Sequence, residues 1–418
     1  MLPSLNRYRW LLQLGKPLLL GYTAWQGRQQ GEARFYRERR GYYLQAEQDR
    51  PLWLHAASIG EFNGILPLIE TLREHQPKLP LLLTTATPSS GQLALKRLPA
   101  GVSHAYLPVD WPQAVARFFD HFKPRAGVIM ETELWPNLFA TADARDIPLV
   151  IVNGRLSPRT LKAPAWLRRL YAQTLGHTRA ILARSEEDRL AFIALGAAAD
   201  RVSTIGNLKF SAVAEQAPAP IDLGQPYVLA ASTREGEEKL VVEAWCRTNQ
   251  ETHLLVIAPR HPQRRASIIQ DLTGFGLELA VRSRGERPGA GTGIYLADTF
   301  GELTGFISGA ELVFMGGSLV PKGGQNLLEP AAMGKAIVCG PHMDNFSDET
   351  RLLLENGGLQ MVDNVDGLAG VFSQLLEHAG QSASLGQAAR QVVEARRDMA
   401  WRYYQSLQAC LSQVLVSA

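Results

Sequence analysis

Polar side chains follow many of the short apolar runs in this 418-residue chain, where strands are expected to end. In LHAASIGEFNG, Leu54–Gly64, Glu61 stands in a glycine-containing turn between an apolar run, 51–57, and a helical run expected from Asn63. A carboxylate there can cap the helix, because free N–H groups and the helix dipole favour negative charge. It can also point into a cleft and accept a proton. The motif alone leaves both interpretations open.

A second acidic pair, Glu131 and Glu133, lies in METELWPN directly after the apolar run 128–130. Because side chains alternate along a strand, one of the two is expected to face a cleft and the other the protein. No His or Asp stands at ligand spacing, so the sequence predicts a hydrogen-bonding site and no metal. Four further residues after strand-like runs are predicted to line the same cleft: Ser58, Gly60, Thr85 and Arg155.

A glycine-rich stretch, GGSLVPKGGQNLLEPAAMGK at 316–335, is typical of a phosphate site. Glycines allow close backbone approach, and a helix start offers N–H donors. The stretch matches neither the dinucleotide nor the Walker pattern, which favours a nucleotide sugar. Glu329 is expected to point at sugar hydroxyls, although a glycine-rich turn with a capped helix would also explain the stretch. The residues predicted to bind this donor are Ser232, Thr233, Arg234, Arg260, Gly317, Ser318, Gly324, Gln325, Asn326 and Glu329.

Apolar runs alternate with helical runs along both halves of the chain, which predicts parallel sheets in two Rossmann-like domains facing across a cleft. The strand-like runs are 51–57, 79–85, 126–130, 148–153, 180–183, 202–205, 227–231, 253–258, 277–282, 294–297, 312–315 and 336–339. The chain is expected to divide into an N-terminal segment, 1–33, a first domain, 34–210, a linker, 211–226, and a second domain, 227–418. The Ala- and Pro-rich composition of 211–226 indicates the linker.

The N-terminal segment is apolar, aromatic and basic, but Gly15, Lys16 and Pro17 interrupt it. It falls short of the uninterrupted apolar length of about 20 residues that a spanning helix needs. It is expected either to lie in a membrane interface or to pack on the protein's own core. A net charge of +3 argues against a nucleic-acid partner, and three cysteines without a pairing pattern argue for a reducing compartment.

Together, HAASIGEFNG, METELWPN, NGRLSPR, GNLKF, ASTREGEE, PRHP and the glycine-rich stretch resemble the 3-deoxy-D-manno-octulosonic acid (Kdo) transferases of lipopolysaccharide biosynthesis. The motifs run in order from about Arg34 to about Phe346. The resemblance implies a GT-B glycosyltransferase fold, CMP-Kdo as donor and a lipid A precursor (lipid IVA) as acceptor. It implies inverting, metal-independent transfer without a cofactor, in which Glu61 corresponds to the proposed general base. It also implies a monotopic enzyme on the cytoplasmic face of the inner membrane, which favours the interfacial interpretation of 1–33.

The sequence departs from the family at Gln325, where the family has His, and at Leu327, where it has Pro. Gln donates hydrogen bonds but cannot carry a proton, which excludes proton transfer at that position. A carboxylate at a helix start is expected to have a lowered pKa, which would make Glu61 a weaker base. Two rivals stay open: a GT-B transferase or epimerase that uses a UDP-sugar, and a non-catalytic homologue that binds a sugar nucleotide or lipid.

Overall fold

The computed structural model describes residues 4–44, 50–213, 219–248 and 252–412. The chain divides into two compact units, Met1–Ala212 with Asp398–Ala418, and Val213–Arg397. The predicted second domain runs to residue 418, whereas in the structure the described residues 398–412 belong to the first unit. The physical reason is packing: Tyr403 is fully buried there, and its hydroxyl donates to the carbonyl of Gly206 at 2.8 Å.

The first unit contains a seven-stranded parallel sheet with the order β3-β2-β1-β4-β5-β6-β7. Its strands are β1 (Leu52–His55), β2 (Leu81–Thr85), β3 (Val102–Tyr106), β4 (Ala126–Met130), β5 (Leu149–Gly154), β6 (Thr178–Ala183) and β7 (Val202–Thr204). Its α-helices are α1 (Ser4–Gln29), α2 (Ala33–Glu38), α3 (Ile59–His75), α4 (Pro88–Arg97), α5 (Pro112–Phe122), α6 (Pro136–Asp143), α7 (Pro158–Leu161), α8 (Ala165–Gly176), α9 (Glu186–Leu195) and α17 (Met399–Cys410). Two 3-10 helices, η1 (Ala199–Arg201) and η2 (Leu208–Ala212), complete it.

Helices cover both faces of this sheet. α3 contacts α4 and α17. Among the other helices, α5 contacts α6, and α6 contacts α8. Phe118 and Phe119 of α5 and Phe139 of α6 are buried against Trp53 and Ile129 of the strands. A parallel sheet covered in this way is buried throughout, which is why most of its strands read as continuous apolar runs.

The second unit contains another seven-stranded parallel sheet, with the order β10-β11-β9-β8-β12-β13-β14. Its strands are β8 (Tyr227–Thr233), β9 (Leu254–Pro259), β10 (Glu278–Val281), β11 (Thr292–Leu296), β12 (Leu312–Met315), β13 (Ala336–Cys339) and β14 (Gln360–Met361). Its α-helices are α10 (Glu237–Cys246), α11 (Arg265–Leu272), α12 (Leu303–Gly309), α13 (Leu328–Ala332), α14 (Ser347–Glu355), α15 (Val365–Glu377) and α16 (Ala379–Glu394). Its 3-10 helices are η3 (Pro262–Arg264), η4 (Thr273–Phe275), η5 (Arg282–Arg284) and η6 (Asp344–Phe346).

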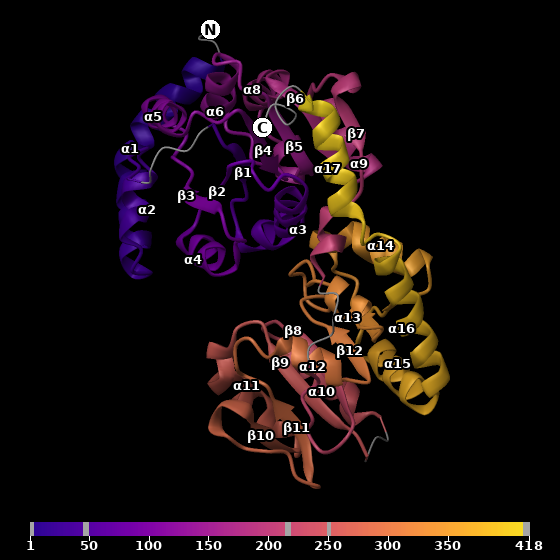
Figure 1. Cartoon of the computed structure of the whole chain (residues 1–418). Coiled ribbons are helices and arrows are strands. Elements are labelled where there is room, and N and C mark those ends of the chain that lie inside the picture. The colour runs from indigo at the N-terminus through magenta and orange to yellow at the C-terminus, as the bar shows by residue number, and fades with distance from the viewer. Residues whose placement is uncertain (1–3, 45–49, 214–218, 249–251, 413–418) are drawn as a thin grey trace. The chain divides into compact units, whose positions relative to one another are not determined.

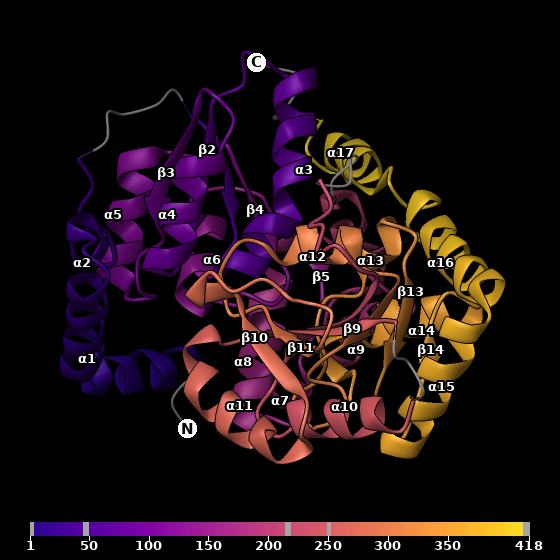
Figure 2. The same cartoon turned by 90° about the horizontal axis from the view of Figure 1, so that it is seen from below.

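The second core lies between this sheet and the helices α10, α11 and α15. Trp245 of α10 and Phe372 of α15 meet there, with ring centroids 6.0 Å apart. α16 follows α15 directly and contacts both α13 and β13 (Figure 2). The two parallel α/β units confirm the predicted fold class.

Most of the N-terminal segment forms one continuous helix, α1 (Ser4–Gln29), which runs on through Pro17 and contacts α2 and α8 (Figure 1). Hydrogen bonds from two of its side chains help to hold it to the rest of the first unit. The Tyr8 hydroxyl donates to an Asp110 carboxylate oxygen at 3.0 Å, and Arg9 Nε donates to Asn137 Oδ1 at 2.7 Å. Among the described residues, no helix is both long and apolar enough to cross a bilayer.

Candidate active site

Glu61 lies in the first turn of α3, at the carboxyl end of β1. The helix begins at Ile59 rather than at the expected Asn63, because Ser58 serves as its N-cap and accepts a hydrogen bond from the N–H of Glu61. The Glu61 carboxylate turns back toward the strand. It accepts from the N–H of Ala57 at 2.9 Å and from the Ser58 hydroxyl at 3.0 Å. Capping and orientation of the carboxylate are therefore combined in one turn.

Glu131 and Glu133 stand on the loop after β4, which neighbours β1 in the sheet. The expected alternation between cleft and protein does not hold. The strand ends at Met130, and Glu131 adopts a left-handed backbone conformation with φ of 58°. Lys209 of η2 forms an ion pair with Glu131 at 2.7 Å. This loop thus brings two carboxylates, instead of one, close enough to act on Glu61.

Glu133 is held by the indole of Trp135 and lies near the imidazole of His55. The indole N–H of Trp135 donates to Glu133 Oε2 at 2.7 Å, and Nε2 of the buried His55 lies 3.9 Å from the same oxygen. Burial works to raise the pKa of Glu133, but contacts with His55, Trp135 and Arg39 outweigh it and lower this pKa below its ordinary value. Glu133 is therefore a fixed negative charge.

The pKa of Glu61 is raised to about 8, against the expected lowering. Burial of the carboxylate is the largest cause, and the negative charges of Glu131 and Glu133 add to it. The hydrogen bonds from Ala57 and Ser58 act in the opposite direction and are the weaker effect. Glu61 thus has the pKa of a good proton acceptor near neutral pH, which removes the objection that a helix start makes it a weak base.

The other residues predicted for this side fall into two groups. Gly60 precedes Glu61 in the first turn of α3, and Ser58 is the N-cap of that helix. Thr85 is fully buried, with its hydroxyl 2.9 Å from His104 Nε2, so its side chain serves the interior. Arg155 follows β5 and accepts a hydrogen bond from Thr132 through its carbonyl, which ties its loop to the loop that carries Glu131.

In the second unit, a buried carboxylate occupies the backbone donors expected to bind phosphate. Glu237 accepts from the N–H groups of Gly317, Ser318 and Leu319 at 2.5, 3.0 and 2.9 Å. The Ser318 side chain is fully buried, and its hydroxyl donates to the carbonyl of Met315. Gly317 and Ser318 therefore shape the loop. Their backbone N–H groups already donate to Glu237.

Thr233 is also an interior residue. Its hydroxyl donates to Glu238 at 3.0 Å, and Glu238 forms an ion pair with Arg264 at 2.9 Å. The helix α10 starts at Glu237, after Gly236, whose left-handed φ of +86° favours glycine. Glu237 and Glu238 therefore serve the structure of the second unit.

The backbone N–H of Arg234 also donates to Glu237, at 3.1 Å, but its guanidinium group has a different partner. One terminal nitrogen of Arg234 lies 2.7 Å from Nε2 of the exposed His261. Ser232, with a left-handed φ of 56°, and Arg260 line a small cavity of about 110 Å³ together with the exposed Phe300. These groups collect at the carboxyl ends of β8 and β9, where open parallel sheets bind ligands.

The glycine-rich stretch ends in a small polar cluster. Asn326 Oδ1 accepts from the N–H of Leu328, and its amide nitrogen donates to Glu329 at 3.3 Å. Burial raises the pKa of Glu329, and the Asn326 contact partly opposes this. Gly324 has φ of +74°, and a Cβ at this position would collide with Met343. Gln325 is half-buried on the same turn.

Three residues that organise these sites were not among the predicted site residues: Lys209, His55 and Glu237. All three lie within the quoted motifs, GNLKF, HAASIGEFNG and ASTREGEE, so their presence was visible although their partners were not. No group of three or more His, Cys, Asp or Glu side chains in the described part of the chain is arranged to hold a metal ion.

Two parallel α/β units of this kind define the class of GT-B glycosyltransferases and related enzymes. A solved glycosyltransferase from Rickettsia africae has the same fold, with a TM-score of 0.64 and 12% identity over 89% of this chain and 100% of that one. A putative UDP-N-acetylglucosamine 2-epimerase from Listeria monocytogenes matches with a TM-score of 0.60 and 15% identity, over 88% of this chain and 98% of that one. At these identities the likeness establishes the fold.

Sequence comparisons identify the family to which the chain belongs. Residues 34–212 match the family model for 3-deoxy-D-manno-octulosonic-acid transferase (kdotransferase). The chain is 34% identical over 358 residues to the 3-deoxy-D-manno-octulosonic acid transferase of Bordetella pertussis, covering 81% of this chain and 82% of the relative. The Haemophilus influenzae transferase is 32% identical over 377 residues, covering 86% and 87%. The chain belongs to the Kdo transferase family of glycosyltransferases, which confirms the resemblance of its motifs.

Proposed function

We propose that this protein transfers Kdo from CMP-Kdo to a hydroxyl group of a lipid A precursor, with inversion at the anomeric carbon. Membership of the Kdo transferase family supports Kdo as the transferred sugar and CMP-Kdo as its donor. The observation that carries the mechanism is the Glu61 carboxylate, whose pKa of about 8 suits proton abstraction from an alcohol near neutral pH.

In the proposed reaction Glu61 takes the proton of the acceptor hydroxyl while its oxygen attacks the anomeric carbon of Kdo. The bond between that carbon and the phosphate oxygen of CMP breaks, and CMP leaves with the electron pair. Glu131 and Glu133 do not touch the reacting atoms in this scheme. They raise the proton affinity of Glu61, while Lys209 and Trp135 hold them in place.

The leaving phosphate needs positive charge and hydrogen-bond donors where its charge develops. We assign this role to Arg234 and Arg260, with Ser232 and Asn326 as further donors. We assign Glu329 to the hydroxyl groups of the ribose. Its carboxyl group is buried and is held by the side-chain amide of Asn326, and a carboxyl group can form hydrogen bonds with hydroxyl groups. We propose that neither a metal nor a cofactor takes part.

Replacing Arg234 by Ala is expected to raise the KM for CMP-Kdo by about tenfold or more, because a charge-assisted contact to phosphate is lost. Arg234→Lys should recover part of this loss, since it keeps the charge without the planar fork. Arg287→Ala removes an exposed arginine of the same unit and serves as the control. Steady-state kinetics at varied CMP-Kdo concentrations measure these KM values. Equal KM values for both alanine variants would contradict the role of Arg234 in binding the phosphate.

The transfer itself is tested by mass spectrometry of a tetraacylated lipid A precursor incubated with CMP-Kdo that is generated in situ. A gain of one or more Kdo units is expected, and the same gain is expected when EDTA is present during the transfer step. UDP-N-acetylglucosamine in place of CMP-Kdo is expected to give no product. Transfer from the UDP-sugar, or no transfer at all with folded protein, would contradict the proposal.

We further propose that the protein is peripheral to the cytoplasmic face of the inner membrane, with α1 at the lipid interface. Large apolar side chains at helical spacing form an exposed face of α1, and Leu14 and Leu18 are 60% and 80% exposed. The members of this face are Trp10, Leu14, Leu18, Tyr22 and Trp25. Tyr8 and Arg9 hold α1 on the domain, so the helix combines both alternatives of the sequence analysis.

The double change Leu14→Gln and Leu18→Gln is expected to lower partitioning onto anionic vesicles by about tenfold or more, because each buried Leu contributes about 1.5–3 kcal/mol. Leu95→Gln with Leu190→Gln changes two similarly exposed leucines of the same unit and is expected to leave partitioning unchanged. Co-sedimentation with vesicles measures both. Equal partitioning of the two double variants would contradict the role of α1.

A further inference from the structure

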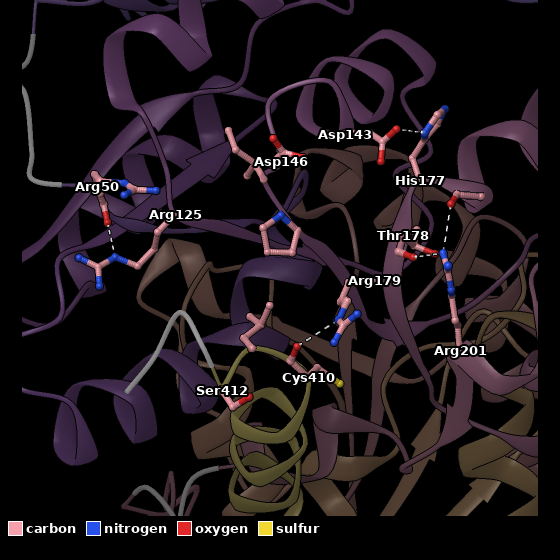
Figure 3. Close-up of a pocket in the computed structure, with 14 residues that line it drawn as sticks. Arg50, Arg125, Asp143, Asp146, His177, Thr178, Arg179, Arg201, Cys410 and Ser412 are labelled. Atoms are coloured by element: carbon pink, nitrogen blue, oxygen red, sulfur yellow. Dashed lines mark hydrogen bonds and ion pairs between the residues drawn. The ribbon is translucent and has the colours of Figure 1, made fainter. Parts of the chain in front are cut away.

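A second polar site lies in the first unit, and Figure 3 shows the residues that line it. It lies at the amino ends of the strands, whereas Glu61 follows the carboxyl end of β1. A basin of about 690 Å³ opens there. Four arginines from separate segments line it: Arg50 before β1, Arg125 before β4, Arg179 in β6 and Arg201 before β7. The parallel sheet brings them together, since β1, β4, β5, β6 and β7 are neighbours in it.

Backbone carbonyls fix three of these guanidinium groups. Arg125 Nε donates to the carbonyl of Arg50 at 2.6 Å, and Arg179 Nε lies 3.4 Å from the carbonyl of Cys410 at the end of α17. One terminal nitrogen of Arg201 donates to the carbonyls of Gly176 and Thr178. A guanidinium has five N–H donors, so an anchor of this kind orients the group without exhausting it. In Figure 3, Arg50 and Arg125 approach from one side of the basin and Arg179 and Arg201 from the other.

Among the described residues that line the basin, arginines outnumber carboxylates. Elsewhere in the same unit arginines form ion pairs with carboxylates, as Arg184 does with Asp188 at 2.8 Å. In the described part of the chain, Arg50, Arg179 and Arg201 form no such pair. Two aspartates line the basin, Asp143 and Asp146, and His177 holds the first of them at 2.8 Å.

We propose that this basin binds a ligand with at least two phosphate groups, at a site separate from the one that contains Glu61. Arginine forks match phosphate oxygens in a bidentate manner, and arginines on two sides of a basin suit two phosphates better than one. The volume falls within the range of small-molecule sites. The same chemistry is found in soluble polyphosphorylated molecules and in the headgroup of a diphosphorylated lipid.

The test uses purified full-length protein and two probes, tripolyphosphate in solution and vesicles with or without cardiolipin. The site variant combines Arg50→Glu with Arg179→Glu, whose side chains are exposed. The control combines Arg168→Glu with Arg169→Glu, two exposed arginines of α8 outside the basin. Both variants change the net charge by the same amount, so any difference between them reports location rather than overall charge.

Isothermal titration is expected to show tripolyphosphate binding that weakens by about tenfold or more in the site variant and stays within about twofold of wild type in the control. If cardiolipin-dependent sedimentation falls in parallel, the ligand is a lipid headgroup, and if it is unchanged, the ligand is soluble. Equal weakening in both variants, or no tripolyphosphate binding by the wild type, would overturn the proposal. Thermal melts of both variants establish that they are folded.

Discussion

Glu61→Gln is expected to lower kcat by about a thousandfold, the middle of the range that a positioned general base contributes. The amide keeps the size of the side chain: its oxygen can accept from the N–H of Ala57, and its NH2 group can donate to the Ser58 hydroxyl oxygen. Gln is also tolerated at this position of a capping motif, so the start of α3 should be preserved. The substitution therefore removes the base and leaves the cap.

This choice separates the two roles that the sequence left open for Glu61. If the carboxylate only caps α3, the Gln variant should melt close to wild type and turn over close to wild type. If the carboxylate is the general base, the Gln variant should keep the melting temperature of the wild type and lose turnover. Initial rates of Kdo transfer at saturating substrate, together with thermal melts, distinguish these outcomes.

The matched control is Glu186→Gln, which changes an exposed acid in the first turn of α9. That helix also begins with a serine N-cap, Ser185, but Glu186 is paired with Arg189 on the surface. We expect wild-type kcat from it. A Glu61→Gln enzyme within a few-fold of the control would show that another group accepts the proton.

The buried strands explain why the fold could be predicted from the sequence. Runs such as Ala126–Met130 are apolar at every position, because helices cover both faces of a parallel sheet. The strand β3, with the sequence VSHAY, was not among the predicted strands. It lies at the edge of the sheet and mixes polar with apolar residues, so its pattern carries a weak signal.

The candidate site was predictable only to the level of its loops. Strand ends located Glu61, Glu131 and Glu133, because side chains that follow parallel strands gather at one edge. Their pKa values and partners depend on residues distant in sequence. Lys209 reaches Glu131 across 78 positions, and no local pattern indicates that contact.

The donor side shows the same limit more strongly. Glu237 occupies the N–H groups of Gly317 and Ser318, which are about 80 positions away along the chain. A glycine-rich loop signals that backbone donors are available, but not whether the protein itself fills them. We therefore expect the phosphate contacts to come from Arg234 and Arg260, as proposed above.

The pH dependence of kcat/KM is expected to show an acid limb with an apparent pKa near 8, because Glu61 must be ionised to accept a proton. A single such group makes kcat/KM about fiftyfold lower at pH 6 than at pH 8. The stability effect has the opposite sign. Since folding raises this pKa above its ordinary value of 4.5, the contribution of Glu61 to stability is full below that pH and is lost as the pH rises through about 8.

Glu131→Gln is expected to move the acid limb toward lower pH, because it removes one of the two negative charges that raise the pKa of Glu61. The Lys209 ammonium, released from its ion pair, acts in the same direction. Because the three carboxylates interact, the limb reports an apparent pKa of the set. Ionisation of the substrates cannot shift with this substitution, and Glu186→Gln should leave the limb in place. An acid limb that stays near pH 8 in Glu131→Gln would show that the carboxylate cluster does not set the proton affinity of the base.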